Sequence, residues 1–248
     1  PMIRSLFIPE DGCVWGCFDY NQQEPRLVVH YASLQQLPSA FTVVDAYKEG
    51  NADFHGIVAD MAQIPRSQAK VINLGLFYGM GKAKLQAELG VSKEKSDDLF
   101  ATYHSRVPFV KQLMNAVSQR AQQRGQIRTL LGRLCRFHLW EPNYFGIHKA
   151  LPHEEALLEH GPGIKRAFTY KSLNKLIQGS AADMTKKCML ELYKKGIIPH
   201  IQIHDELDIS VKNDKEAKDI VEIMESAVEL AIPNKVDYES GDNWGKIH

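Results

Sequence analysis

The chain has 248 residues, of which 44% are hydrophobic and 24% are charged, so it can bury a sizeable core. No apolar run approaches the length of a membrane span, and residues 2–5 lack a signal-peptide pattern. We therefore expect no membrane partner and a cytoplasmic location. The four cysteines form no CxxC pair, which favours reduced thiols over a zinc site.

Charge is segregated along the chain, although the formal net charge is zero. From Ile197 to the end, twelve acids face five bases, whereas the stretch from Leu99 to Trp140 has seven bases and no acid. Basic stretches can neutralise phosphates, and clustered carboxylates can hold metal ions. Solvated helix faces are the alternative explanation. The seven bases are Arg106, Lys111, Arg120, Arg124, Arg128, Arg133 and Arg136.

The first half of the chain is predicted to be one strand followed by helices. The apolar, β-prone run Gly12–Tyr20 indicates a buried strand that ends in an acid. Amphipathic spacing then predicts helices over Glu24–Leu34, Pro65–Phe77 (with Pro65 at its first position), Lys93–Tyr103 and Val107–Arg124.

The second half begins with Gly125, which should end the preceding helix. A short hairpin is expected over Ile127–Phe137, turning at Leu131–Gly132, and His138–Pro162 is predicted to be a long loop or insertion. A long helix (Tyr170–Lys195), a strand–turn–strand unit (Ile198–Val211) and a surface helix (Asp214–Leu230) complete the chain.

Acids at strand ends form the first candidate site. Asp19 closes the first strand, and Asp205 and Glu206 lie at the turn between two apolar strands. Carboxylates beside a core are costly unless a cation compensates them, and hard divalent cations prefer oxygen ligands. Two such ions can clamp the attacking and leaving oxygens of a phosphoryl transfer. The alternative is that these are ordinary solvent-facing turn residues.

A row of side chains at four-residue spacing forms the second candidate site. Arg66 and Lys70 lie one turn apart on a predicted helix face, where they could bind a triphosphate, and Lys70 could protonate a leaving pyrophosphate. Leu74 and Tyr78 continue the row, where a sugar and base would lie. The alternative is an amphipathic helix with exposed cations. Gly75 and Gly79 weaken that alternative, because glycine suits a helix interior mainly where something packs close.

The segment after Asp19 adds a further acid. Glu24 follows five residues later, where its carboxylate could exclude a ribose 2′-hydroxyl; the alternative is a helix N-terminal acid favoured by the macrodipole.

Three segments resemble the motifs of a known family. DYNQQEPR (19–26), RSQAKVINLGLFYG (66–79) and IHDEL (203–207) resemble motifs A, B and C of family A DNA polymerases, in the same order. NADFH (51–55), NKLIQG (174–179) and the C-terminal GDNWGKIH are also similar to segments of that family. The resemblance covers essentially the whole chain.

The resemblance implies an α+β right-hand polymerase fold with an antiparallel palm sheet and inserted helical fingers. Palm would comprise 1–32 and 161–248, and fingers 33–160, with the motif B helix at 65–79 and the motif C hairpin at 198–211. The thumb has no counterpart in this chain, which implies an N-terminal segment or chain that carries it. The long segment 138–162 implies a phage-like branch, and hence a host cytoplasm.

The resemblance also implies roles for individual residues in adding dNTPs to a primer–template. Two Mg²⁺ ions, with Mn²⁺ as an alternative, would be held by Asp19, Asp205 and the Tyr20 carbonyl. Catalytic support would come from Glu206 and Lys70. The nucleotide would contact Arg66, Lys70, His55, Leu74, Tyr78, Glu24 and Gln22; DNA would contact His204, Gln178, Asn174, Arg128 and Arg133. Leu74 departs from the family, which usually has Phe or Tyr there.

Three other functions remain open at this point. A single-subunit RNA polymerase is disfavoured by Glu24 and the DYNQQEPR form. A two-metal nuclease is disfavoured because it would not explain the cations of the Arg66–Lys70 helix. A DNA-binding module without activity, or a catalytic portion inactive without a thumb-bearing partner, is the third.

Overall fold

The computed structural model describes residues 3–50, 53–78, 82–144 and 146–247. It divides into two compact units: unit 1 comprises Pro1–His30 and Ser180–His248, and unit 2 comprises Tyr31–Gly179. Unit 2 is therefore inserted into the sequence of unit 1. Within the described residues, no helix has both the length and the apolarity needed to span a membrane.

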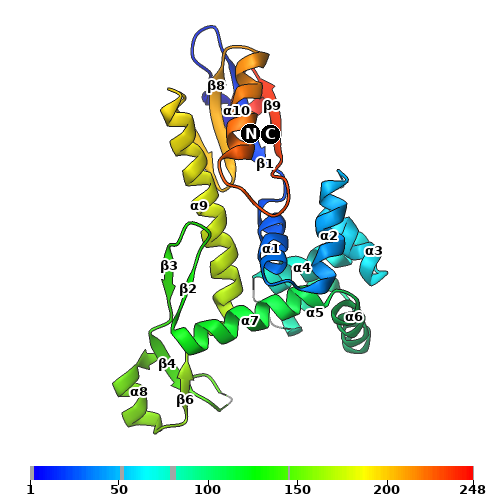
Figure 1. Cartoon of the computed structure of the whole chain (residues 1–248), viewed down its shortest axis with the longest axis vertical. Helices are drawn as coiled ribbons and strands as arrows, with labels where there is room; N and C mark the ends of the chain where they lie inside the picture. Colours follow the sequence, from blue (N-terminus) through cyan, green and yellow to red (C-terminus); the bar gives the residue numbers. More distant parts are fainter. Residues whose placement is uncertain (1–2, 51–52, 79–81, 145, 248) are drawn as a thin grey trace. The chain divides into compact units, whose positions relative to one another are not determined.

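Unit 1 is built on one four-stranded antiparallel sheet with the strand order β7-β8-β1-β9 (Figure 1). Helix α10 contacts β8 and β9. The elements are η1 (Arg4–Leu6), β1 (Val14–Tyr20), β7 (Ile201–Ile203), β8 (Glu206–Val211), α10 (Asp214–Ser226), β9 (Val236–Gly241) and η3 (Trp244–Lys246). Helices α1 (Gln23–Leu34) and α9 (Ser172–Lys194) run across the unit boundaries in sequence.

Alternation along β1 gives the sheet two buried faces. Trp15 and Cys17 pack with Trp244 on one face, where Phe7 contacts both tryptophan rings edge-on. Phe18 stacks on Tyr238 on the other face, at 4.7 Å between ring centroids. Because successive side chains of a strand point to opposite faces, this apolar run is buried on both sides.

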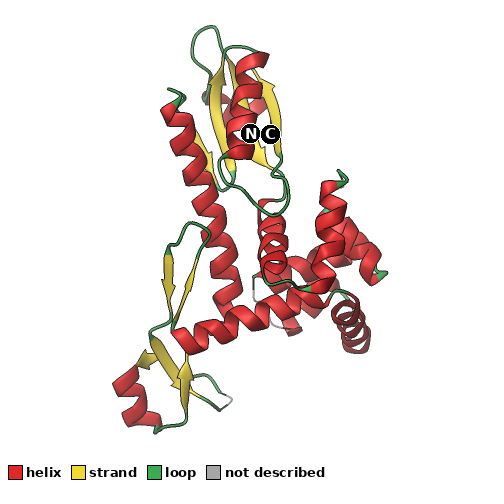
Figure 2. Cartoon of the chain, in the orientation of Figure 1, coloured by secondary structure: helices red, strands yellow, loops and turns green. Residues whose placement is uncertain are grey.

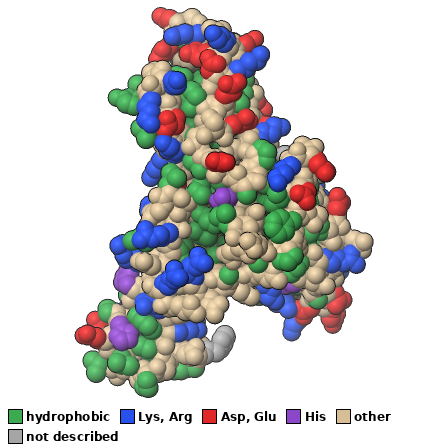
Figure 3. Space-filling model, viewed as in Figure 1, with side chains coloured by type: hydrophobic (Ala, Val, Ile, Leu, Met, Phe, Trp, Pro, Cys, Tyr) green, Lys and Arg blue, Asp and Glu red, His purple; other side chains and the backbone are tan. Residues whose placement is uncertain are grey.

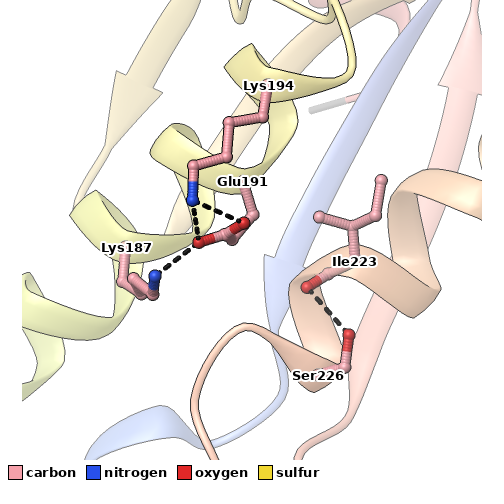
Figure 4. A network of polar contacts seen from close by, with 5 residues as sticks. All are labelled: Lys187, Glu191, Lys194, Ile223 and Ser226. Atoms are coloured by element: carbon pink, nitrogen blue, oxygen red, sulfur yellow. Dashed lines mark hydrogen bonds and ion pairs between the residues drawn. The ribbon is translucent and has the colours of Figure 1, made fainter.

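The helices of unit 1 carry polar contacts on their outer surfaces (Figure 4). Lys187 and Lys194 flank Glu191 on α9, and this pairing lowers the pKa of the Glu191 carboxyl. On α10, the Ser226 hydroxyl donates to the Ile223 carbonyl at 3.4 Å. Such partly exposed contacts contribute little to stability, so the buried apolar residues of these helices, such as Leu192 and Ile220, contribute more.

Unit 2 is mainly helical, with two small sheets (Figure 2). Phe54 lies in its core against Phe77 and Phe109, from three different helices. Its remaining elements are α2 (Pro38–Lys48), α3 (Phe54–Ala62), α4 (Arg66–Phe77), α5 (Lys82–Leu89), α6 (Lys93–Arg106), α7 (Pro108–Arg124), β2 (Gln126–Arg128), β3 (Leu134–Arg136), β4 (Leu139–Pro142), β5 (Leu151–Pro152), α8 (His153–His160), β6 (Ile164–Arg166) and η2 (Thr169–Lys171).

The prediction of a long loop over His138–Pro162 was wrong. The segment contains β4, β5 and α8, and with β6 it forms a three-stranded antiparallel sheet of order β5-β4-β6. Trp140 is the centre of this small sheet: the Arg166 guanidinium lies over its ring at 4.5 Å, and His153 contacts it edge-on. Strands of two to four residues carry too little periodicity to be recognised in a segment rich in Pro, Gly and His.

Other predicted boundaries shift by a few residues. The first strand begins at Val14, because Gly12 turns the chain with φ +77°. Pro65 is the N-cap of α4 and not its first residue. The long helix begins at Ser172, after η2, and α10 ends at Ser226. Helices α2, α3 and α5 and strand β9 were not predicted.

Candidate active site

The acids of the first and third motifs meet at one end of the unit 1 sheet. β1 and β8 are antiparallel neighbours, and their register places Asp19 opposite Glu206. Asp205 lies in the turn before β8, where its backbone carbonyl accepts the Tyr20 N–H at 3.4 Å. The preceding residue, His204, adopts the left-handed conformation with φ +54° and is exposed. Sheet pairing thus brings distant carboxylates to the same strand ends.

The charges at these strand ends favour the binding of a cation. Asp205 is half-buried, and its burial raises the pKa of the carboxyl because the charged form loses hydration. Asp19 is exposed, and the sheet register places it opposite Glu206, the residue after Asp205. Tyr20 fixes the end of β1, since its hydroxyl donates to the Met224 carbonyl of α10 at 2.7 Å. The donors are all oxygens, which fits a hard cation such as Mg²⁺ or Mn²⁺.

A second group of possible metal ligands lies near these strand ends, on β1 and β8. Within the described residues, the ligand atoms of Cys17, Glu206 and Asp208 are the one set of three or more that lie within 4.8 Å of one another. Trp15 Nε1 and Cys17 Sγ both donate to Asp208 Oδ1, at 2.9 and 2.8 Å. Burial and Asp208 raise the pKa of the Cys17 thiol far above its usual range, so Cys17 stays protonated.

Asp208 itself was not predicted from the sequence. Its side chain is 0% exposed, between the apolar residues Leu207 and Ile209 of β8. The signal was present as an acid among apolar neighbours in ELDISV (206–211), because a carboxylate is buried only where donors meet it.

The segment after β1 leads directly into helix α1. Gln22 adopts the left-handed conformation with φ +52°, which turns the chain from strand to helix. Glu24 follows in the first turn of α1 and is half-buried. The buried Arg26 fixes this segment, since its Nε donates to the Asn21 carbonyl at 2.6 Å.

The predicted row of unit 2 lies on α4. Arg66 and Lys70 are exposed, Leu74 is half-buried, and Tyr78 is the exposed C-cap residue. Gly79 falls outside the described residues. Arg66 makes a two-pronged ion pair with Asp53, with Nε–Oδ2 2.6 Å and Nη2–Oδ1 2.9 Å. Asp53 belongs to the NADFH segment, but the sequence did not single it out.

His55 is held by a buried hydrogen-bond chain. Asn73 Nδ2 donates to His55 Nδ1 at 3.1 Å, and the Tyr103 hydroxyl donates to Asn73 Oδ1. Burial lowers the pKa of His55 to about 4, with the cations Arg66 and Lys70 acting in the same direction. The imidazole is therefore neutral near pH 7, and since Nδ1 accepts, its proton lies on Nε2. Sequence reasoning found His55 but neither partner.

The residues predicted to contact DNA lie on several elements. Arg128 and Arg133 flank the turn of the β2–β3 hairpin, and Figure 3 shows basic side chains gathered over this part of unit 2. Arg133 Nη2 donates to the Gly179 carbonyl of α9 at 2.6 Å. On α9, Asn174 is half-buried and Gln178, one turn later, is exposed.

Comparisons with known proteins identify the family of the chain. The family model for DNA polymerase family A matches residues 1–246. A DNA-directed DNA polymerase of Pseudomonas phage M6 is 35% identical over 98% of this chain and 40% of its own length. DNA polymerase I of Caldicellulosiruptor bescii is 32% identical, over 98% of this chain and 28% of its own length.

A solved structure is also similar. The POL domain of Pol1 from M. smegmatis, in complex with DNA primer-template and dNTP, matches with a TM-score of 0.76 and 25% identity. The match covers 99% of this chain and 42% of that one. This chain thus spans less than half the length of each of these three proteins. The family match over 1–246 and the paired acids of β1 and β8 lead to one conclusion: the chain belongs to DNA polymerase family A.

Proposed function

We propose that this chain is the catalytic portion of a template-directed DNA polymerase. In the reaction, a primer 3′-hydroxyl attacks the α-phosphorus of a dNTP, a new P–O bond forms, and pyrophosphate leaves. The observation that carries the proposal is the register that pairs Asp19 with Glu206, next to Asp205, in a family A chain. In this proposal the unit 1 sheet is palm and the helices of unit 2 are fingers.

The acids of unit 1 would hold the metals. Asp19, Asp205 and the Tyr20 carbonyl supply oxygen ligands for two Mg²⁺ ions, and bound ions would supply charge stabilisation to the phosphoryl group. Glu206 supports the primer end from the adjacent position on β8, and His204 lies next to it in the turn.

The nucleotide would be bound mainly by cations of α4. Arg66 binds the triphosphate, and Lys70 donates a proton to the leaving pyrophosphate. The neutral His55 would donate its Nε2–H to a phosphate oxygen. Gln22 and Glu24 would face the sugar, with Glu24 excluding a 2′-hydroxyl. Leu74 and Tyr78 would contact the sugar and guard the templating position.

Primer–template would be held by two groups of residues, on the β2–β3 hairpin and on α9. Arg128 and Arg133 on the hairpin would neutralise phosphates, while Asn174 and Gln178 track primer and template along α9. The similar M. smegmatis POL domain was solved in complex with DNA primer-template and dNTP, which supports these partners.

Primer extension with Mg²⁺ tests the proposal. Asp19→Asn and Asp205→Asn should each lower extension on the order of 100-fold or more, because each removes a charged metal ligand. Asp214→Asn, at an exposed position in the first turn of α10, is the matched control and should extend at the wild-type rate. Retained extension in both site variants would contradict the proposed metal ligands.

The same assay separates the other candidates. Primer shortening without nucleotide would indicate a nuclease, ribonucleotide incorporation an RNA polymerase, and binding without extension a DNA-binding module. A thumb-bearing partner segment stays a prediction, prompted by the greater length of the relatives. Restoration of extension by adding the preceding part of a relative's polymerase domain would support it; full extension by this chain alone would contradict it.

A further inference from the structure

We infer that Asp53 is a positioning residue for nucleotide binding: it holds the Arg66 guanidinium with its outer N–H groups free to take a triphosphate. The inference rests on the proposed function and concerns unit 2 alone. It gives a role to an acidic residue in a site that would bind the triphosphate through cationic side chains.

The atoms used in the ion pair carry the argument. Asp53 takes Nε–H and one N–H of Nη2, which is the side of the guanidinium nearest the chain. An arginine has five N–H donors, so three remain: two on Nη1 and one on Nη2. Within the described residues, Arg66 makes no other hydrogen bond. The remaining donors form the end-on fork that binds phosphate through two parallel hydrogen bonds.

The pair is poorly suited to a purely structural role. The side chains of Arg66 and Asp53 are 55% and 38% exposed, and exposed ion pairs contribute little to folding. The Arg66 guanidinium lowers the pKa of the Asp53 carboxyl, so the acid keeps its charge at neutral pH. An arginine already held in one geometry loses less side-chain freedom when it binds phosphate, which strengthens binding.

Gly56 makes room for this arrangement. A Cβ at Gly56 would lie 2.5 Å from Asp53 Oδ2, closer than atoms can approach. A side chain at position 56 would therefore force the Asp53 carboxylate to shift, whereas glycine leaves it in place to pair with Arg66. Gly56→Ala displaces the acid without changing any charge, and it adds a better helix former.

An opposite role for Asp53 makes an opposite prediction. If the acid blocked Arg66 and had to be displaced by the triphosphate, its removal would strengthen nucleotide binding. The positioning role predicts weaker binding. The two roles are separated by the direction of one measured change.

The experiment is steady-state primer extension by the full chain with dNTP titration. Asp53→Asn and Gly56→Ala should each raise the KM for dNTP roughly 5- to 30-fold and leave kcat within about 2-fold, because a prearranged binding group is lost. Asp53→Glu should recover part of the loss. Asp97→Asn, which breaks the exposed Lys82–Asp97 pair of the same unit, is the control with wild-type KM. An unchanged or lowered KM in both variants overturns the inference.

Calorimetric binding of tripolyphosphate to the full chain separates this inference from the proposed function. Weaker binding by Asp53→Asn and Gly56→Ala than by wild type and Asp97→Asn supports the positioning role, even if no variant extends a primer. Absence of extension in the wild type would instead count against the proposed function. Equal tripolyphosphate binding by all four proteins overturns the inference whatever the extension assay shows.

Discussion

The imidazole of His55 shows how one residue's surroundings fix its chemistry. The ring is 6% exposed and accepts from Asn73, whose own carbonyl oxygen is taken by Tyr103. A resemblance in sequence pointed to His55 as a phosphate contact, but not to its neutral state. That state depends on α4 and α6, which lie far along the chain, so no local pattern could reveal it.

The lowered pKa of His55 makes the stability of the fold depend on pH. Between about pH 6.5 and 4 the unfolded chain binds a proton that folded His55 refuses, so the free energy of unfolding falls as the pH drops through this window. His55 adds up to about 1.4 kcal/mol per pH unit to the slope of the free energy of unfolding against pH, and it adds no slope above this window. Urea unfolding across pH 4–7 should show a smaller slope for His55→Gln than for wild type. His138→Gln, at an exposed position, should keep the wild-type slope; equal slopes in all three proteins would contradict the assignment.

The sequence did not single out Asp53 and Asp208, and the physical reason is the same for both acids. Each is held by hydrogen-bond partners on other elements: Arg66 for Asp53, and Trp15 and Cys17 for Asp208. Asp19 and Asp205 were recognisable because each stands at the end of an apolar run. The end of an apolar run can be recognised in the sequence, whereas a partner on another strand or helix is known only once the fold is known.

At the scale of elements, helix α4 combines the proposed nucleotide-binding residues with a packing surface. The sequence predicted its extent to within one residue, because its apolar positions recur at helical spacing. The same reasoning expected something to pack close to Gly75. A Cβ at Gly75 would lie 2.3 Å from Leu85 Cδ1, on the neighbouring helix α5. The two helices therefore approach closely at this glycine.

Gly75→Ala should destabilise the protein by about 1–2 kcal/mol, although alanine favours a helix, because the added methyl overpacks against a buried leucine. Leu85→Ala removes the obstructing atoms. In that background, Gly75→Ala should be neutral or stabilising by up to about 1 kcal/mol. Chemical denaturation of the four proteins measures this coupling. Strict additivity of the two substitutions would show that the methyl has room and that the close approach does not matter.

The two small sheets of unit 2 differ in how well the sequence predicted them. The β2–β3 hairpin was predicted correctly, with its turn at Gly132 (φ +90°), because a glycine interrupts two β-prone runs. The next segment was taken for a loop. Its strands are stabilised by contacts with Trp140, from Arg166 and His153, and such contacts leave no periodic trace.

For the whole molecule, the segregation of charge has a measurable consequence. The stretch from Leu99 to Trp140 lies in unit 2 and carries only basic charge, while the acidic end of the chain lies in unit 1. If Arg128 neutralises a phosphate, Arg128→Gln should reduce the slope of log K against log salt for primer–template binding by about 0.9. Fluorescence anisotropy over a salt series measures this slope. Lys215→Gln, on α10 in unit 1, should leave it unchanged; a matching decrease in both would show that net charge alone matters.

The nested order of the two units also sets the sequence of events during synthesis. β1 leaves the ribosome before unit 2, but its partner β8 follows only after it: Cys17 and Asp208, which face each other across these strands, are 191 positions apart. Closing so long a loop is slow unless the intervening chain folds first and shortens it. Unit 2, with its helices and local hairpin, can fold during this interval. The carboxylates of β1 and β8 are therefore brought together only after unit 2 has been made, and a nascent chain stopped inside unit 2 has a folded helical body but no paired carboxylates.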